Sequence, residues 1–255
     1  QDALAQSYNL ATVRLGLDIG LGRIAETMKK MGVQRDIPEV PSLLLGSLAL
    51  TPFEVAGVYQ TIAANGFKTE LKAIREVLNA EGKPLTRYPL QVKQIFKPQS
   101  IYPLQYAMQR VMWEGTGRAI YNHFPSDMGF AGKTGTTNDM RDSWFVGMSG
   151  NYLAVAWVGR DDNGQTKLTG ATGALPIWKG FMTYADPKPF HPFQAEGMKP
   201  VWIDRVSGLI SAKGCPNSVL VILKESMMPE GVEACAEKPF WDGWFERESD
   251  EGGEL

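Results

Sequence analysis

The stretch Ala131-Gly132-Lys133-Thr134-Gly135-Thr136-Thr137 is the most informative in the chain, together with the two apolar runs that follow it at 143–148 and 152–158. Ser149-Gly150-Asn151 separates these runs, and β-rich runs around such a turn predict an antiparallel hairpin. A Lys-Thr-Gly strand beside the hairpin would place an ammonium, hydroxyls and a closely approachable glycine on one sheet edge. That combination suits a site that holds a carboxylate and lets a carbonyl lie against backbone amides.

A phosphate-binding loop is the main alternative for Gly132-Lys133-Thr134. That loop needs a further glycine five positions before Gly132, between a strand and a helix, and the residue there is Asp127. The residues after Lys133 also lead into strand rather than helix. The pattern therefore argues against nucleotide binding. Taken alone, the motif also fits an ordinary edge strand that carries Thr and Lys by chance.

A second polar motif, Ser7-Tyr8-Asn9, lies in a stretch expected to be helical from Asp2 to Leu17. Ser and Asn are mediocre helix residues because their side chains compete for backbone partners. In isolation they would indicate an exposed bend. Paired with Lys-Thr-Gly, they supply two of the three elements found in serine acyl-transferases such as penicillin-binding proteins and class A β-lactamases.

The resemblance extends beyond these motifs and covers roughly residues 1–190. It is carried by five further stretches: 23–32, 40–47, 50–56, 115–118 and 157–161. They resemble the transpeptidase domain of bifunctional class A penicillin-binding proteins, most nearly the 1b type of Gram-negative bacteria. The resemblance implies an α/β (α+β) fold of the penicillin-binding and β-lactamase kind, an antiparallel sheet flanked by helices and incomplete at its N-terminal side.

The element that carries the family's nucleophile does not occur in this sequence. The nucleophile is the Ser of a Ser-x-x-Lys element that precedes Ser-x-Asn, and no Ser here is followed by Lys three positions later. We expect this element to precede Gln1 in the native protein, and the 255 residues alone to be inactive. One alternative is a non-catalytic binding or regulatory module of the same fold. A β-lactamase is a lesser alternative, since Glu26 and Glu54 lack the context of a water-activating base.

The resemblance implies a D,D-transpeptidase that transfers the acyl group of D-alanyl-D-alanine stem peptides and is acylated by β-lactams. Ser7 would relay a proton toward the leaving amine, Asn9 would orient the substrate, and Lys133 would supply positive charge. The implied substrate-binding residues are Thr134, Gly135 and Thr136, with hydroxyls on the carboxylate and the Thr136 N–H in the oxyanion hole. No cofactor is implied, and with two His in the chain no metal site is expected.

Composition constrains the partners and the compartment. The net charge of −2 gives no indication of nucleic-acid binding, and no run of some 18 apolar residues occurs. By resemblance, the parent protein would carry a membrane anchor and a peptidoglycan glycosyltransferase domain and act on the periplasmic face of the inner membrane. A regulatory lipoprotein or other cell-wall machinery would be its partners.

Local signals predict helices over 21–31, from Pro52 to Asn65 with Thr51 and Glu54 as a capping box, from a Ser100 cap to Gly115, and over 175–184. They also predict a surface hairpin from 73–79 and 85–88. Helices on both sides of the sheet would make an α/β/α sandwich.

A Pro-rich stretch near residue 190 predicts a domain boundary. We expect a transpeptidase domain at 1–190, a small β-rich module at 191–245, and an acidic, disordered tail at 246–255. Cys215 and Cys235 lie within the module. They would be buried thiols in a reducing compartment, and a disulfide in the oxidising compartment that the family resemblance implies.

Overall fold

A computed structural model describes residues 1–237, so the acidic tail predicted at 246–255 lies outside the described residues. The chain divides into two compact units, Gln1–Phe193 and Gln194–Leu255. In the described part, no helix combines the length and the apolar character needed to cross a membrane.

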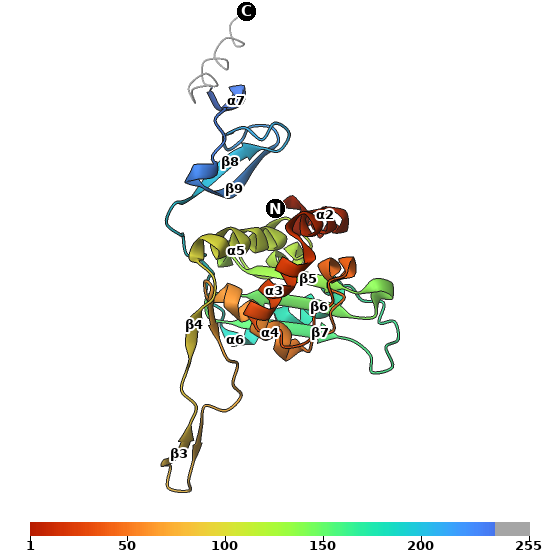
Figure 1. Ribbon diagram of the computed structural model, residues 1–255, viewed down its shortest axis with the longest axis vertical. Coiled ribbons are helices and arrows are strands. Elements are labelled where there is room, and N and C mark those ends of the chain that lie inside the picture. The colour runs from red at the N-terminus through yellow and green to blue at the C-terminus, as the bar shows by residue number, and fades with distance from the viewer. Residues whose placement is uncertain (238–255) are drawn as a thin grey trace, which may run out of the picture. The chain divides into compact units, whose positions relative to one another are not determined.

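The first unit is a mixed helix and sheet structure (Figure 1). Its helices are α1 (Asp2–Ala5), α2 (Asn9–Ile19), α3 (Leu21–Met31), α4 (Pro52–Ala63), α5 (Pro98–Trp113) and α6 (Leu175–Ala185), with short turns of helix at η1 (Pro41–Leu45), η2 (Arg118–Asn122), η3 (Ser126–Met128), η4 (Asn138–Met140) and η5 (Gly170–Ala174). Its strands are β1 (Phe67–Thr69), β2 (Glu76–Leu78), β3 (Pro84–Arg87), β4 (Val92–Gln94), β5 (Ala131–Thr136), β6 (Ser143–Met148) and β7 (Leu153–Val158).

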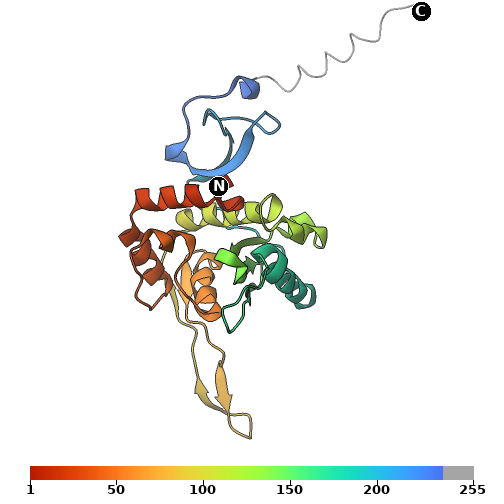
Figure 2. The same cartoon turned by 90° about the vertical axis from the view of Figure 1, so that its right-hand side faces the viewer.

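The central sheet has the order β5-β6-β7 and is antiparallel throughout, so the predicted hairpin and the Lys-Thr-Gly strand beside it are confirmed. In its register Lys133 lies opposite Val146, and Val146 opposite Val155. The sheet lies between α4 and α6 (Figure 2). The antiparallel sheet with flanking helices agrees with the expected fold class.

Each face of the sheet has its own apolar core, because side chains alternate along a strand. On one face, Met148 packs with residues of α4 and α5 such as Ile62 and Met108. On the other face, Phe145 packs beneath Trp178 of α6. Along β5, Ala131, Lys133 and Gly135 therefore lie on the face covered by α4 and α5. Gly132, Thr134 and Thr136 lie on the face covered by α6.

Gly147 allows α6 to approach the sheet closely. Trp178 is 1% exposed, its Nε1–H donates to the Gly147 carbonyl over 3.2 Å, and its ring meets the Phe145 ring edge-on at 5.2 Å. A Cβ atom at Gly147 would lie 2.7 Å from Trp178 Cε2, closer than packed carbon atoms tolerate. The indole therefore occupies the space that any side chain at position 147 would need.

Gly147→Ala is expected to lower the free energy of unfolding by about 1–3 kcal/mol, the usual penalty for overpacking a core. Gly180→Ala is the matched control, because Gly180 lies within α6 and nothing approaches its added Cβ within 4 Å. That change should be neutral or stabilising by roughly 0.5–1 kcal/mol. Urea unfolding of both variants measures the difference, and equal stability would contradict the packing argument.

Two predicted helix boundaries are wrong. The helix expected from Asp2 to Leu17 is broken, because Ser7 has a φ of 59°, in the left-handed region, between α1 and α2. Ser100 does not cap α5, which begins at Pro98 because proline at the first helical position has its φ already set. The capping box of Thr51 and Glu54 at the start of α4 is confirmed.

The predicted surface hairpin is also present, and it is part of a longer two-stranded arm. Strand β2 pairs with β3, and nearer the helices β1 pairs with β4, both antiparallel. In Figures 1 and 2 the β2–β3 end of this arm points away from the helices of the unit.

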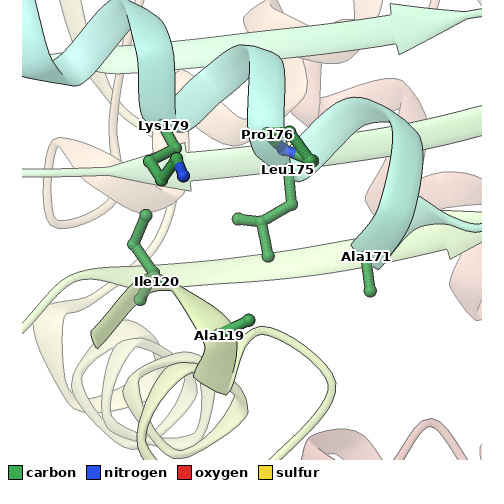
Figure 3. A pocket seen from close by; sticks show the side chains of 6 residues that line it. All are labelled: Ala119, Ile120, Ala171, Leu175, Pro176 and Lys179. Atoms are coloured by element: carbon green, nitrogen blue, oxygen red, sulfur yellow. The ribbon is translucent and has the colours of Figure 1, made fainter. Parts of the chain in front are cut away.

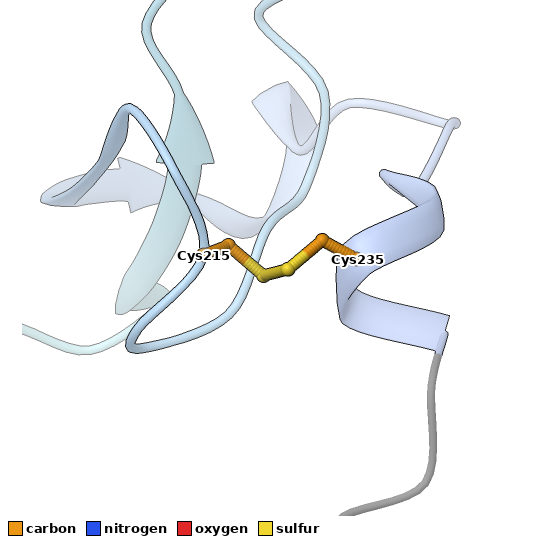
Figure 4. The surroundings of a disulfide bond; sticks show 2 residues. All are labelled: Cys215 and Cys235. Carbon is orange, nitrogen blue, oxygen red and sulfur yellow. A yellow bond between two sulfur atoms is a disulfide. The ribbon is translucent and has the colours of Figure 1, made fainter. Parts of the chain in front are cut away.

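The second unit is built on a two-stranded antiparallel sheet of β8 (Met198–Asp204) and β9 (Ser218–Lys224), followed by η6 (Glu225–Met227) and α7 (Ala234–Glu237). The carboxylate of Asp204 accepts the N–H groups of Val206 and Ser207 and fixes the turn after β8. A disulfide joins Cys215 to Cys235, whose Cα atoms are 5.9 Å apart (Figure 4).

Thiol titration tests this pairing in protein prepared under oxidising conditions. Denatured, unreduced protein should contain no free thiol, and the same protein after reduction should contain two. The bond closes a separation of 20 residues, which is worth on the order of 3 kcal/mol in the loop-entropy view. Two free thiols before reduction would mean that the pair packs as small apolar side chains instead.

Candidate functional site

The left-handed turn at Ser7 places the first polar motif. The Ser7 N–H donates to the Leu4 carbonyl over 3.3 Å, and the Tyr8 N–H donates to the Ala3 carbonyl over 2.8 Å, which closes α1. The chain then leaves the turn and restarts as α2 at Asn9, whose side chain is exposed. Ser7 therefore lies in the turn between α1 and α2, where the chain changes direction, and it is exposed there.

Lys133 lies against the turn at Ser7. Its Nζ donates to Ser7 Oγ over 2.9 Å and to the carbonyl of Thr134 over 2.9 Å. This is the contact expected from the two motifs, although 126 positions separate the two residues in the sequence. Burial lowers the pKa of Lys133 to about 8, because desolvation disfavours the ammonium.

The two threonine hydroxyls lie on the other face of β5, as strand alternation predicts. Thr134 Oγ1 lies 2.6 Å from Thr116 Oγ1, and Thr136 Oγ1 accepts the N–H of Gly170 over 2.9 Å. Each hydroxyl thus has a fixed partner within the protein. Asn9 has no side-chain hydrogen bond to this cluster within the described residues, so the structure brings together Ser7 and Lys133 but does not attach Asn9 to them.

The backbone of β5 offers donors along one edge. The Thr137 N–H donates to the Asp142 carbonyl on the β6 side, over 3.2 Å. In an antiparallel strand successive residues direct their N–H groups to opposite sides. The N–H groups of Thr136 and Thr134 therefore face away from β6, along the edge that no strand of the described sheet covers. This is the edge at which a carbonyl could lie against backbone amides.

Sequence reasoning missed Thr116, which lies in the loop after α5. Its N–H donates to the Ala5 carbonyl over 3.2 Å, while its hydroxyl contacts Thr134. The sequence signal at this position is the Gly-Thr-Gly-Arg stretch at 115–118, which carries part of the family resemblance but no catalytic chemistry of its own.

A small cavity lies between η2 and α6 (Figure 3). Its volume is about 60 Å³, and it is lined by Ala119, Ile120, Ala171, Leu175, Pro176 and Lys179. Ligand sites usually measure some 300–1,000 Å³, so this cavity can hold water but not a peptide. The candidate site is the Ser7–Lys133 contact together with the free edge of β5, because the two polar motifs meet there.

Lys133 should lose its proton at about pH 8 in the folded chain. In the unfolded chain it keeps that proton to its ordinary, higher pKa, so this group makes stability rise with pH between those two values. The ¹³Cε chemical shifts of lysine-labelled protein measure the titration, and Lys133→Arg identifies the signal. Lys93 on β4 is the exposed comparison. A Lys133 signal that titrates together with exposed lysines would contradict the desolvation argument.

Comparison with known proteins gives one family. The sequence profile of the penicillin binding protein transpeptidase domain matches residues 1–174. Penicillin-binding protein 1B of Vibrio cholerae is 48% identical over 187 residues, 73% of this chain and 24% of that protein. Penicillin-binding protein 1B of Escherichia coli is 39% identical over 214 residues, 84% of this chain and 25% of that protein. The chain thus spans about a quarter of the length of these relatives.

The fold agrees with a solved structure. The crystal structure of penicillin-binding protein 1A from Haemophilus influenzae superposes with a TM-score of 0.80 at 23% identity, over 91% of this chain and 40% of that one. At this identity the likeness establishes the fold.

Proposed function

The chain belongs to the penicillin-binding protein transpeptidase domain family, and from this premise we propose that it carries the substrate-binding half of a D,D-transpeptidase site. The reaction is peptidoglycan cross-linking, in which a D-alanyl-D-alanine stem peptide acylates a serine and an acceptor amine then takes the acyl group. The serine comes from a Ser-x-x-Lys element outside these 255 residues. The contact of 2.9 Å between Lys133 Nζ and Ser7 Oγ is the observation that supports this proposal most directly.

Ser7 and Lys133 serve proton transfer in this mechanism. Attack of the nucleophilic serine on the penultimate carbonyl gives a tetrahedral intermediate, and its collapse breaks the amide bond, so the leaving D-alanine amine must gain a proton. The Ser7 hydroxyl passes that proton, and the Lys133 ammonium holds Ser7 Oγ in place. General acid–base assistance of this kind contributes typically 10²–10⁴-fold in rate.

The free edge of β5 serves binding. Thr136 N–H faces that edge and donates to the developing oxyanion, where one donor can be worth roughly 3 kcal/mol. Gly135 has no side chain, so on the face of β5 that also carries Lys133 the substrate backbone can approach the strand closely. The hydroxyls of Thr134 and Thr136 lie on the α6 face of this strand. Each can donate to the terminal carboxylate while its oxygen keeps the partner already described.

A β-lactamase activity is disfavoured by the state of Glu54. Its carboxylate pairs with Arg35 over 2.8 Å and accepts from Thr51, and these bonds, with Arg35 the largest contribution, lower the pKa of Glu54 to about 2. A carboxylate so acidic and so engaged is a poor base for activating water. The other candidate base, Glu26, is exposed on α3 and has no hydrogen-bond partner there that would orient it toward a water, within the described residues.

For the whole protein we propose the remaining parts of the family pattern. They are a glycosyltransferase domain, a single membrane anchor, a location on the periplasmic face of the inner membrane, and regulation by a lipoprotein or other cell-wall proteins. A non-catalytic binding or regulatory module remains the alternative. The coding sequence upstream of Gln1 decides between the two, because only the enzyme requires Ser-x-x-Lys there.

Lys133→Ala and Ser7→Ala, made in the gene product that contains this chain and the nucleophile, should each slow acylation by a fluorescent penicillin at least about 100-fold. The melting temperature should change little, because Ser7 is exposed in the turn between α1 and α2 and Lys133 lies only partly buried on the edge strand β5. Lys93→Ala on the arm is the control and should acylate at the wild-type rate. The 255-residue chain alone should form no adduct that survives denaturation.

Two results would contradict the proposal. One is an acylation rate that stays at the wild-type level in both site variants. The other is a denaturation-resistant adduct on the 255-residue chain, mapped to Ser7 or another of its serines, which would place the nucleophile within this sequence.

A further inference from the structure

We infer that Thr116 is a positioning residue, which holds the Ser7 turn and the Thr134 hydroxyl in one fixed arrangement. This inference rests on the proposed function for its meaning in catalysis, but its geometric content stands on the described contacts alone. Thr116 is the residue at which the two motifs of the site, far apart in the sequence, are connected through a third segment.

The backbone of Thr116 fixes the turn. Its N–H donates to the carbonyl of Ala5, two residues before Ser7, over 3.2 Å. Gly115 makes this approach possible, because a Cβ atom at that position would overlap the same Ala5 carbonyl oxygen. The side-chain amide of Gln6 donates to the Glu114 carbonyl over 3.1 Å, so two consecutive residues before Ser7 are tied to the loop.

The end of α5 anchors the loop in turn. Arg110, 4% exposed, donates to Asp2 at the start of α1 over 2.6 Å and also pairs with Glu114. A charge buried this deeply requires good partners, and it has a carboxylate on each of the two elements that it joins. Helix α1 is therefore held by α5 at its first turn and by the Thr116 loop at its last.

The side chain of Thr116 fixes the strand. Its Oγ1 lies 2.6 Å from Thr134 Oγ1, and Thr134 is also the residue whose carbonyl accepts from Lys133 Nζ. When Thr116 donates in this pair, the Thr134 proton is free for an outside acceptor such as a carboxylate. Thr116 thus orients the hydroxyl that the proposed reaction uses, without touching the substrate itself.

The first test uses the 255-residue chain. Three-bond couplings to the Thr134 methyl carbon report its χ1 rotamer, and the wild type and Thr116→Ser should show one rotamer. Thr116→Val keeps the backbone contact to Ala5 but loses the hydroxyl, so Thr134 should average over rotamers while the fold is retained. A Thr134 rotamer that stays fixed in Thr116→Val would overturn the inference, whatever the enzyme activity proves to be.

The second test measures acylation by benzylpenicillin in the longer gene product. Thr116→Val should lower the second-order acylation rate about tenfold, the loss expected for one hydrogen bond to a charged group. Thr116→Ser should restore the rate, and Thr86→Val on β3 of the arm should leave it unchanged. Thr116→Val combined with Thr134→Val should be no slower than Thr134→Val alone, because Thr116 acts through Thr134.

The outcomes separate the two proposals. A wild-type protein that is not acylated contradicts the proposed function, and the rotamer measurement then decides the positioning role by itself. An acylated wild type with an equally fast Thr116→Val overturns the positioning role and leaves the proposed function standing. Losses that multiply in the double variant would also overturn it, since they would mean that Thr116 acts independently of Thr134.

Discussion

The attachment of the α1 turn to the end of α5 is the constraint on which the site depends. Ser7 lies on a segment of only a few residues, and α1 is far too short to be stable by itself. Its position comes from the Arg110–Asp2 ion pair and from the Thr116 N–H on Ala5. Helix α5 also packs against β5 through the core around Met108 and Ala131. The same helix therefore fixes the position of the strand that carries Lys133. One rigid element thus determines both halves of the Ser7–Lys133 contact.

Local signals were sufficient wherever the chain organises itself over a few residues. The hairpin of β6 and β7, the capping box at Thr51 and the β2–β3 hairpin are all set by neighbours in the sequence, and all were predicted. The pairing of β1 with β4, which joins residues 67–69 to 92–94, was not. The contact between Lys133 and Ser7 was predicted only because the two motifs resembled a known family. No periodicity or turn signal in a single sequence connects residues 126 positions apart.

The helix wrongly predicted to run through Ser7 and the missed role of Thr116 also have physical causes. A left-handed backbone at a non-glycine residue is uncommon, and Ser7 adopts it where the two residues before it are tied down, since the Ala5 carbonyl accepts from Thr116 and the Gln6 side chain donates to the Glu114 carbonyl. Sequence patterns report local preference, so they extended the helix through a position that tertiary contacts break. Thr116 was missed for a related reason, since its role consists of two long-range hydrogen bonds and its sequence context marks only a loop.

The state of Lys133 connects this architecture to the proposed chemistry. Its partners, Ser7 Oγ and the Thr134 carbonyl, are neutral oxygens, and no carboxylate forms an ion pair with it within residues 1–237. Two neutral acceptors do not offset the loss of water, so the pKa of Lys133 is lowered to about 8. An anion that entered beside it would favour the ammonium and raise that pKa again. The site therefore keeps a positive charge that contacts the Ser7 hydroxyl and has no countercharge. Such an arrangement gains most when the countercharge arrives as the carboxylate of a ligand.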